Sequence, residues 1–171
     1  DIYVTGNLGD SYLGLKALSN KIKFRNKDKL FFIDKYYKPE LPLNLTKYLL
    51  KFANSSIDVS DGLIDDLAKM INRQSLSFHL FENKIPVSNK LSNLIKKQRL
   101  NKINLISNGD DYQVLFTADI NKARIIQKAS KTTGIKITKI GKIVSGKDRS
   151  LIFDEKGKQI RAKSKGYIHQ F

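Results

Sequence analysis

Hydrophobic side chains recur at helical spacing in several parts of the chain. The clearest set falls at positions i, i+1, i+4, i+7 and i+8 and predicts a helix with one buried face. Its members are Leu63, Ile64, Leu67, Met70 and Ile71. Similar patterns predict helices over residues 10–18, 43–52, 86–95 and 120–132, and a short helix within residues 20–42 that ends in a proline-marked connection. Asp10 or Ser11 is the expected cap of the first helix.

Alternation of apolar and polar residues predicts strands in other segments. Leu76, Phe78 and Leu80 alternate with Ser77 and His79. Further strands are expected over residues 1–5, 57–59, 114–117 and 135–140, with a hairpin that joins residues 151–153 to 158–162. Helices and strands intermix without a regular β-α-β rhythm, so we predict the α+β class, with a mixed β-sheet packed against helices. The length of 171 residues is typical of one domain.

The composition excludes several kinds of chemistry. The chain has no Cys and only two His, which excludes disulfides, thiolate zinc sites and cysteine nucleophiles and disfavours a histidine-rich metal site. No apolar run approaches the roughly 20 residues that a membrane span needs, and the first residues lack the pattern of a signal peptide. We therefore expect a cytoplasmic protein without a membrane partner.

The net charge of +16 raises the question of nucleic-acid binding. The cations are 26 Lys and only 6 Arg, and Ile and Asn are also abundant, a combination that accompanies AT-rich coding sequences. The lysines are spread along the chain, whereas nucleic-acid readers favour Arg and clustered basic stripes. The charge therefore favours a lysine-rich background, and a non-enzymatic basic module that binds nucleic acid is kept as an alternative.

A stretch without cations stands out in this basic chain. Residues 53–68 contain no Lys or Arg, yet they hold Asp58, Asp61, Asp65 and Asp66. Crowded carboxylates need a counter-charge, and Mg²⁺ prefers carboxylate and phosphate oxygens. A strand-to-helix junction here would add the hydroxyl of Ser60, free helix amides for phosphate, and close ligand approach at Gly62. This pattern is what a metal–nucleotide site needs.

A plainer interpretation of the same stretch is helix capping. Ser and Asp are preferred N-cap residues, and Asp in the first turn is favoured by the helix dipole. On spacing alone capping is the commoner cause of such a pattern. Asp65 and Asp66 are then expected on the solvated face of the helix.

Two other segments could contact a ligand. Asp110 and Asp111 follow a glycine and precede a strand, so they form either a solvated turn or an acceptor in a cleft for a cationic or amino-bearing ligand. Near the C-terminus, Tyr167 either packs against the core or offers its ring to a flat ligand.

Taken together, four segments resemble the C-terminal half of thiamine-monophosphate kinases. They are residues 1–10, 57–63, 108–117 and 138–143, which occur in the family's order and at about its spacing. The wider superfamily includes aminoimidazole ribonucleotide synthetase and selenophosphate synthetase. The Asp-Val-Ser-Asp-Gly-Leu form of residues 58–63 and the chain's ending favour the thiamine enzyme over these relatives.

The resemblance implies an ATP- and Mg²⁺-dependent phosphotransferase that converts thiamine monophosphate to thiamine diphosphate. It implies that Asp58 and Asp61 bind Mg²⁺, that Ser60 contacts ATP, and that Asp110 and Tyr167 contact the thiamine substrate. Two departures affect the substrate contacts. Asn108-Gly109-Asp110-Asp111 replaces the usual Gly-Gly-Glu-Asp, and the last six residues depart from a Gly-aromatic-Asp-His-Phe pattern.

The resemblance also implies a missing half. We expect residues 1–171 to be a single C-terminal domain, because the chain begins inside a predicted strand and lacks the family's N-terminal domain, which supplies further metal ligands, much of the nucleotide contact and the dimer interface. The complete protein is then expected to be a homodimer, and the chain alone to be inactive. The alternative within the superfamily is another ATP-dependent enzyme, similar to selenophosphate synthetase or aminoimidazole ribonucleotide synthetase.

Overall fold

A computed structural model describes residues 1–22, 24–72, 74–147 and 149–162. The strands are β1 (Ile2–Thr5), β2 (Ala53–Asp58), β3 (Leu76–Phe81), β4 (Val114–Ala118), β5 (Ile137–Ser145), β6 (Leu151–Phe153) and β7 (Gln159–Ile160). The α-helices are α1 (Asp10–Leu18), α2 (Asn26–Tyr37), α3 (Thr46–Leu49), α4 (Leu63–Met70), α5 (Asn89–Gln98), α6 (Lys102–Ile106) and α7 (Ala123–Thr133). Within these ranges no helix is both long and apolar enough to cross a membrane.

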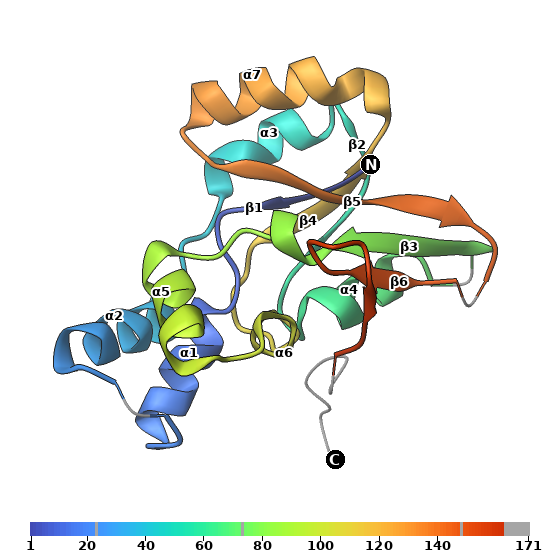
Figure 1. The fold of residues 1–171 in the computed structure, drawn as a ribbon. Coiled ribbons are helices and arrows are strands. Elements are labelled where there is room, and N and C mark those ends of the chain that lie inside the picture. The colour runs from blue at the N-terminus through green and yellow to red at the C-terminus, as the bar shows by residue number, and fades with distance from the viewer. Residues whose placement is uncertain (23, 73, 148, 163–171) are drawn as a thin grey trace, which may run out of the picture.

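The seven described strands form one sheet in the order β2-β4-β1-β5-β3-β6-β7. The pair β3–β6 is parallel and the other neighbours are antiparallel, so the sheet is mixed and the predicted α+β class is confirmed. The hairpin predicted near the end of the chain is also present as β6 and β7. Helices α1, α2 and α5 gather beyond one end of the sheet, while β3 and β5 extend at the other (Figure 1).

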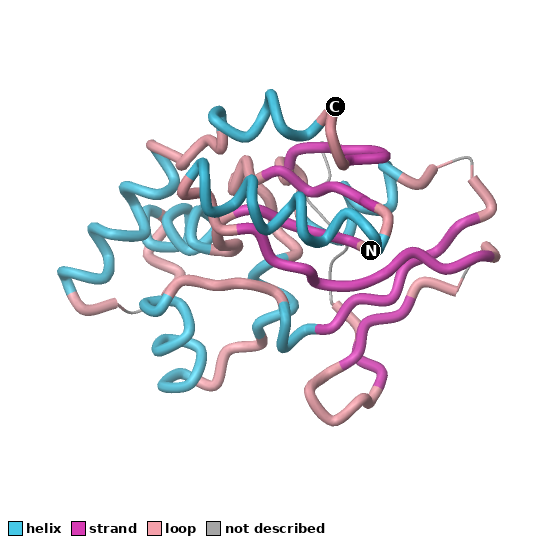
Figure 2. The backbone as a smooth tube through the Cα atoms, turned by 90° about the horizontal axis from the view of Figure 1, so that it is seen from above, coloured by secondary structure: helices cyan, strands magenta, loops and turns pink. Residues whose placement is uncertain are grey.

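Helices cover the central strands on both faces. Along β1, Ile2 and Val4 point into a core shared with α4 and α6, whereas Tyr3 points into a second core with α3 and α7. This alternation follows from the two-residue period of a strand. Figure 2 shows the helices massed toward one side and the strands extending to the other. A third cluster joins α1, α2 and α5 around Phe32 and Leu91.

The predicted elements differ from the observed ones at a few places. The helix predicted over residues 43–52 is a 3-10 turn (Leu43–Leu45) followed by the single turn α3, and α6 was not predicted. The predicted cap of α1 is wrong, because Gly9 is the N-cap with φ of 88° and neither Asp10 nor Ser11 caps the helix. The structure assigns that capping role to a distant carboxylate, described below.

Phe116 is the aromatic centre of the second core. Its ring is fully buried and lies 5.3 Å from those of both Tyr3 and Phe52. We expect Phe116→Ala to lower the free energy of unfolding by about 3–5 kcal/mol, because it leaves a cavity between two packed rings. The control Leu50→Ala alters a side chain that is 93% exposed, and it should change the free energy of unfolding by less than about 0.5 kcal/mol. Urea titration of both variants tests this, and a small loss for Phe116→Ala contradicts it.

Candidate functional site

Two segments that lie about 50 positions apart in the sequence meet at one end of the sheet. One is the acidic loop, defined as residues 58–62, which runs from the last residue of β2 to the start of α4. The other is the facing loop, defined as residues 107–113, between α6 and β4. Backbone hydrogen bonds join them: the N–H of Asp110 donates to the carbonyl of Ser60 at 2.9 Å, and the N–H of Tyr112 donates to that of Val59 at 2.9 Å. The antiparallel pairing of β2 with β4 thus continues into both loops.

Two glycines allow this close contact. A Cβ atom on Gly109 would lie 1.6 Å from the carbonyl oxygen of Ser60, and one on Gly62 would lie 2.2 Å from that of Ser107. Gly62 also has φ of 125°, a conformation that other residues rarely adopt. The expectation that Gly62 gives a ligand room beside the backbone is therefore wrong, because the neighbouring loop fills that space.

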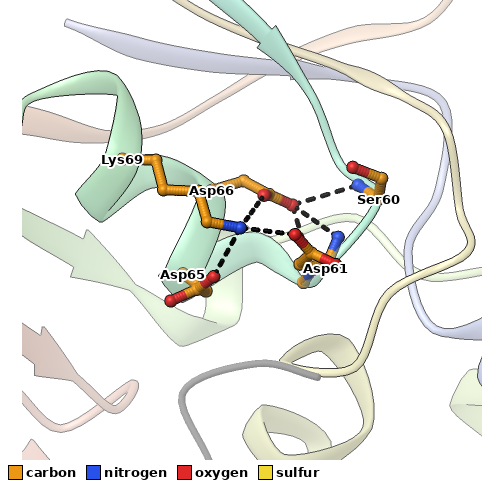
Figure 3. Close-up of polar contacts among 6 residues, drawn as sticks. Ser60, Asp61, Asp65, Asp66 and Lys69 are labelled. Carbon is orange, nitrogen blue, oxygen red and sulfur yellow. Dashed lines mark hydrogen bonds and ion pairs between the residues drawn. The ribbon is translucent and has the colours of Figure 1, made fainter. Parts of the chain in front are cut away.

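Asp66 caps the start of α4 from inside the helix. One carboxylate oxygen, Oδ2, accepts hydrogen bonds from the N–H groups of Ser60, Asp61 and Gly62 at 3.0, 2.9 and 3.0 Å (Figure 3). The residue is buried, and burial raises the pKa of its carboxyl group while the bonds from Gly62 and Asp61 oppose the rise. Asp66 was predicted on the solvated face of the helix, and this prediction is wrong because its side chain is buried. The amides of residues 60–62, which lie at and just before the helix N-cap, are not free for phosphate, because they donate to Asp66.

Lys69 lies among three carboxylates of the same region. Its Nζ forms ion pairs with Asp61, with Asp65 at 2.7 Å and with Asp66 at 3.4 Å (Figure 3). Ligand oxygens of these three residues lie within 4.8 Å of one another, a spacing that could hold a cation. The hydrogen bonds to Asp61 and Asp65 raise the pKa of Lys69. Residues 53–68 contain no cation, and Lys69, one helical turn after Asp65, supplies their counter-charge.

The predicted site residues that the structure describes lie around the two loops. Asp58 is exposed at the end of β2, and Asp110 is half-buried with φ of 68°. Burial raises the pKa of Asp110, and the charge of Asp61 raises it further. Burial also raises the pKa of Tyr112, as do the charges of Asp110, Asp58 and Asp61. The three carboxylates therefore share one neighbourhood near Tyr112. Tyr167 lies outside the described residues.

Sequence reasoning missed a second acidic feature, a buried pair of carboxyl groups beside this site. Asp111 accepts hydrogen bonds from the N–H groups of Gly9 at 2.7 Å and Ser11 at 3.4 Å, so it caps α1 from 100 positions away. Asp10 accepts one from the hydroxyl of Ser88 at 2.7 Å. Both carboxyls line a cavity of about 250 Å³ with Lys35. Gly9, the N-cap of α1, has no side chain that could cap the helix, so the acceptor has to come from elsewhere in the fold. The sequence does not show which residue provides it.

The buried pair predicts how stability depends on pH. Burial raises the pKa of Asp111 to about 8 and that of Asp10 to about 6. The unfolded chain loses these protons near pH 4, whereas the folded chain keeps them until pH approaches the raised values. Folding therefore retains protons between about pH 4 and 8, and stability should fall as pH rises through this range.

We expect the variant Asp111→Asn to flatten this profile. Its amide cannot ionise but keeps an oxygen for the N–H of Gly9. Urea unfolding between pH 5 and 8 should show a smaller decline than in the unmodified chain, by up to about 1.4 kcal/mol per pH unit. Asp34→Asn, which alters a side chain that is 65% exposed, is the control and should follow the unmodified profile. Parallel profiles for all three proteins would contradict the prediction.

Comparisons with known proteins give relatives of the chain in sequence and in fold. No protein-family model matches the chain. Over 98% of its length the chain is 34% identical to thiamine-monophosphate kinase of Buchnera aphidicola subsp. Schizaphis graminum, of which it covers 52%, and 31% identical to that of Escherichia coli K12, of which it covers 51%. A solved structure of AaThiL complexed with AMPPCP and TMP is 28% identical, with a TM-score of 0.75 over 99% of this chain and 50% of that one.

The chain spans about half the length of the curated relatives that it matches. The sequence similarity extends across nearly the whole chain, and the fold matches over the same span. Sequence and fold together identify this chain as a relative of the thiamine-monophosphate kinases, which it matches over about half of their length.

Proposed function

We propose that the protein to which this chain belongs transfers the γ-phosphoryl group of ATP to the phosphate of thiamine monophosphate and forms thiamine diphosphate. The observation that carries the proposal is the meeting of the acidic loop with the facing loop, in a chain similar to these kinases over 98% of its length. The related AaThiL structure, with AMPPCP and TMP bound, supports a nucleotide and a phosphorylated acceptor as the ligands.

In this proposal Asp58 and Asp61 hold Mg²⁺. Their carboxylate oxygens suit a hard divalent cation, and the ion pair of Asp61 with Lys69 indicates that this carboxylate is oriented toward a positive charge. Bound Mg²⁺ would neutralise phosphate charge during transfer between two anionic reactants. We assign metal binding to Asp58 and Asp61 only, and no catalytic acid or base to this chain.

The contacts with the nucleotide and the thiamine substrate are assigned to polar groups that have no role in the metal site. The N–H of Ser60 is bonded to Asp66, so we assign its hydroxyl to the nucleotide. Asp110 and Tyr167 are proposed to contact the thiamine substrate. Asp110 sits on the facing loop, close enough to Asp61 for the charge of one to affect the other, which would bring the acceptor next to the metal-bound nucleotide.

We further propose that the chain is the C-terminal half of a two-domain, homodimeric kinase. Its coverage of about half of each relative supports this view. The other half would supply the remaining metal ligands and nucleotide contacts, and neither half would complete the phosphate site alone.

This proposal predicts that the chain alone has no measurable turnover. A chimera that joins it to the uncovered half of the E. coli relative should convert ATP and thiamine monophosphate to ADP and thiamine diphosphate. In the chimera, Asp61→Asn and Asp58→Asn should each lower kcat/KM by about 100-fold or more, because each removes a proposed metal ligand. Asp34→Asn, a distant exposed residue, should change it by less than about twofold.

Three results would contradict the proposal. Turnover by the isolated chain would show that the other half is dispensable. A chimera that folds and uses ATP only with a different acceptor would favour another enzyme of the superfamily. Salt-sensitive binding of the chain to arbitrary duplex DNA, without any phosphoryl transfer by the chimera, would favour the basic nucleic-acid module.

A further inference from the structure

We propose that Asp66 is a positioning residue, whose buried carboxylate fixes the backbone of the acidic loop and thereby sets where the Ser60 hydroxyl and the Asp61 carboxylate lie. The consequence for the reaction rests on the function proposed above. The contact itself is a property of the folded chain and does not depend on that function.

The geometry around Asp66 is that of a structural anion. Three consecutive N–H groups, those of residues 60–62, converge on the single oxygen Oδ2 at 2.9–3.0 Å. The side chain is only 2% exposed. Hydrogen bonds to a charged acceptor are roughly twice as strong as neutral ones, and buried N–H groups left without an acceptor are costly. The curled conformation of the loop therefore depends on this carboxylate.

Helix geometry explains why the acceptor comes from this position. Gly62 precedes α4 and has no side chain that could cap it. Side chains of a helix lean toward its N-terminus, so Asp66, in the first turn, can reach back over the amides. Asp65 is its neighbour in the same turn, but its carboxylate is partly exposed and pairs with Lys69.

A second link connects Asp66 to Asp61 through Lys69. The Nζ of Lys69 lies 3.4 Å from Oδ1 of Asp66 and also pairs with the carboxylate of Asp61. Asp66 thus holds the backbone of Asp61 directly and its side chain through the ammonium group (Figure 3). Loss of Asp66 would remove the acceptor of the Asp61 amide and one of the three ion pairs that position Lys69, whereas loss of Asp65 would leave the amide contact in place.

Three variants test the inference: Asp66→Ala, Asp66→Asn and the matched control Asp65→Asn. Amide hydrogen exchange of the ligand-free chain is the first measurement. In Asp66→Ala the amides of residues 60–62 should exchange at least about 100-fold faster than in the unmodified chain. Asp66→Asn keeps a neutral oxygen and should fall in between, and Asp65→Asn should stay within about threefold.

Kinetics of the chimera are the second measurement. Asp66→Ala should raise the KM for Mg·ATP at least about tenfold and lower kcat less, because the loop can still be captured by saturating nucleotide. Asp66→Asn should recover part of the loss, and Asp65→Asn should stay within about twofold. A change in thermal stability without this split between KM and kcat would reduce Asp66 to a structural role and overturn the inference.

The two measurements separate this inference from the proposed function. An unmodified chimera that folds but transfers no phosphate would refute the proposed function, and hydrogen exchange would still decide whether Asp66 fixes the loop. Unchanged exchange at residues 60–62 in Asp66→Ala would overturn the positioning role whatever the kinetics. If Asp66→Ala fails to fold, Asp66→Asn carries both comparisons against Asp65→Asn, and equal behaviour of these two variants would also overturn it.

Discussion

The contact between the acidic loop and the facing loop is the constraint on which the site depends. It brings the backbone of Gly109 against the carbonyl of Ser60 and that of Gly62 against Ser107, at separations that leave no room for a side chain. Protein interiors are packed tightly enough that such a contact fixes both partners. Because strands β2 and β4 are paired up to Asp58, the sheet determines which residues of the loops face each other.

Buried aspartate side chains supply the second constraint, since their oxygens act as acceptors for backbone groups that have no local partner. Asp66 serves the start of α4 and Asp111 serves the start of α1, in each case where the N-cap residue is a glycine. Burying an acid is unfavourable unless it is hydrogen-bonded or protonated. The two acids differ in this respect, since Asp66 has three amide donors and a nearby lysine, whereas the environment of Asp111 favours its protonated form at neutral pH.

Sequence patterns predicted the regular elements better than the roles of polar residues. The spacing of Leu63, Leu67 and Ile71 predicted α4, because burial of one helix face depends mainly on local periodicity. The cluster of aspartates was also evident from charge alone. By contrast, the role of Asp66 depends on the direction of three backbone N–H groups, and that of Asp111 on a tertiary contact with Gly9. Neither is encoded in residue spacing, so both acids looked like solvated or ligand-binding groups.

The contacts of Asp66 also bear on why the proposed C-terminal half would be insufficient alone. A helix start near a nucleotide commonly offers free amides to phosphate, but here Asp66 occupies the amides of residues 60–62 and brings negative charge close to them. The amides of residues 60–62 are therefore not open to a phosphate group, and the contacts proposed for this loop are a bridging cation and the Ser60 hydroxyl. The net charge of +16 could attract anionic ligands over a distance, but residues 58–66 hold four aspartates and no cation, and the nearby Lys69 is already paired with three of them. The crowded carboxylates of this loop thus disfavour phosphate groups nearby, and in the proposed two-domain kinase the other half would supply positive groups that offset them.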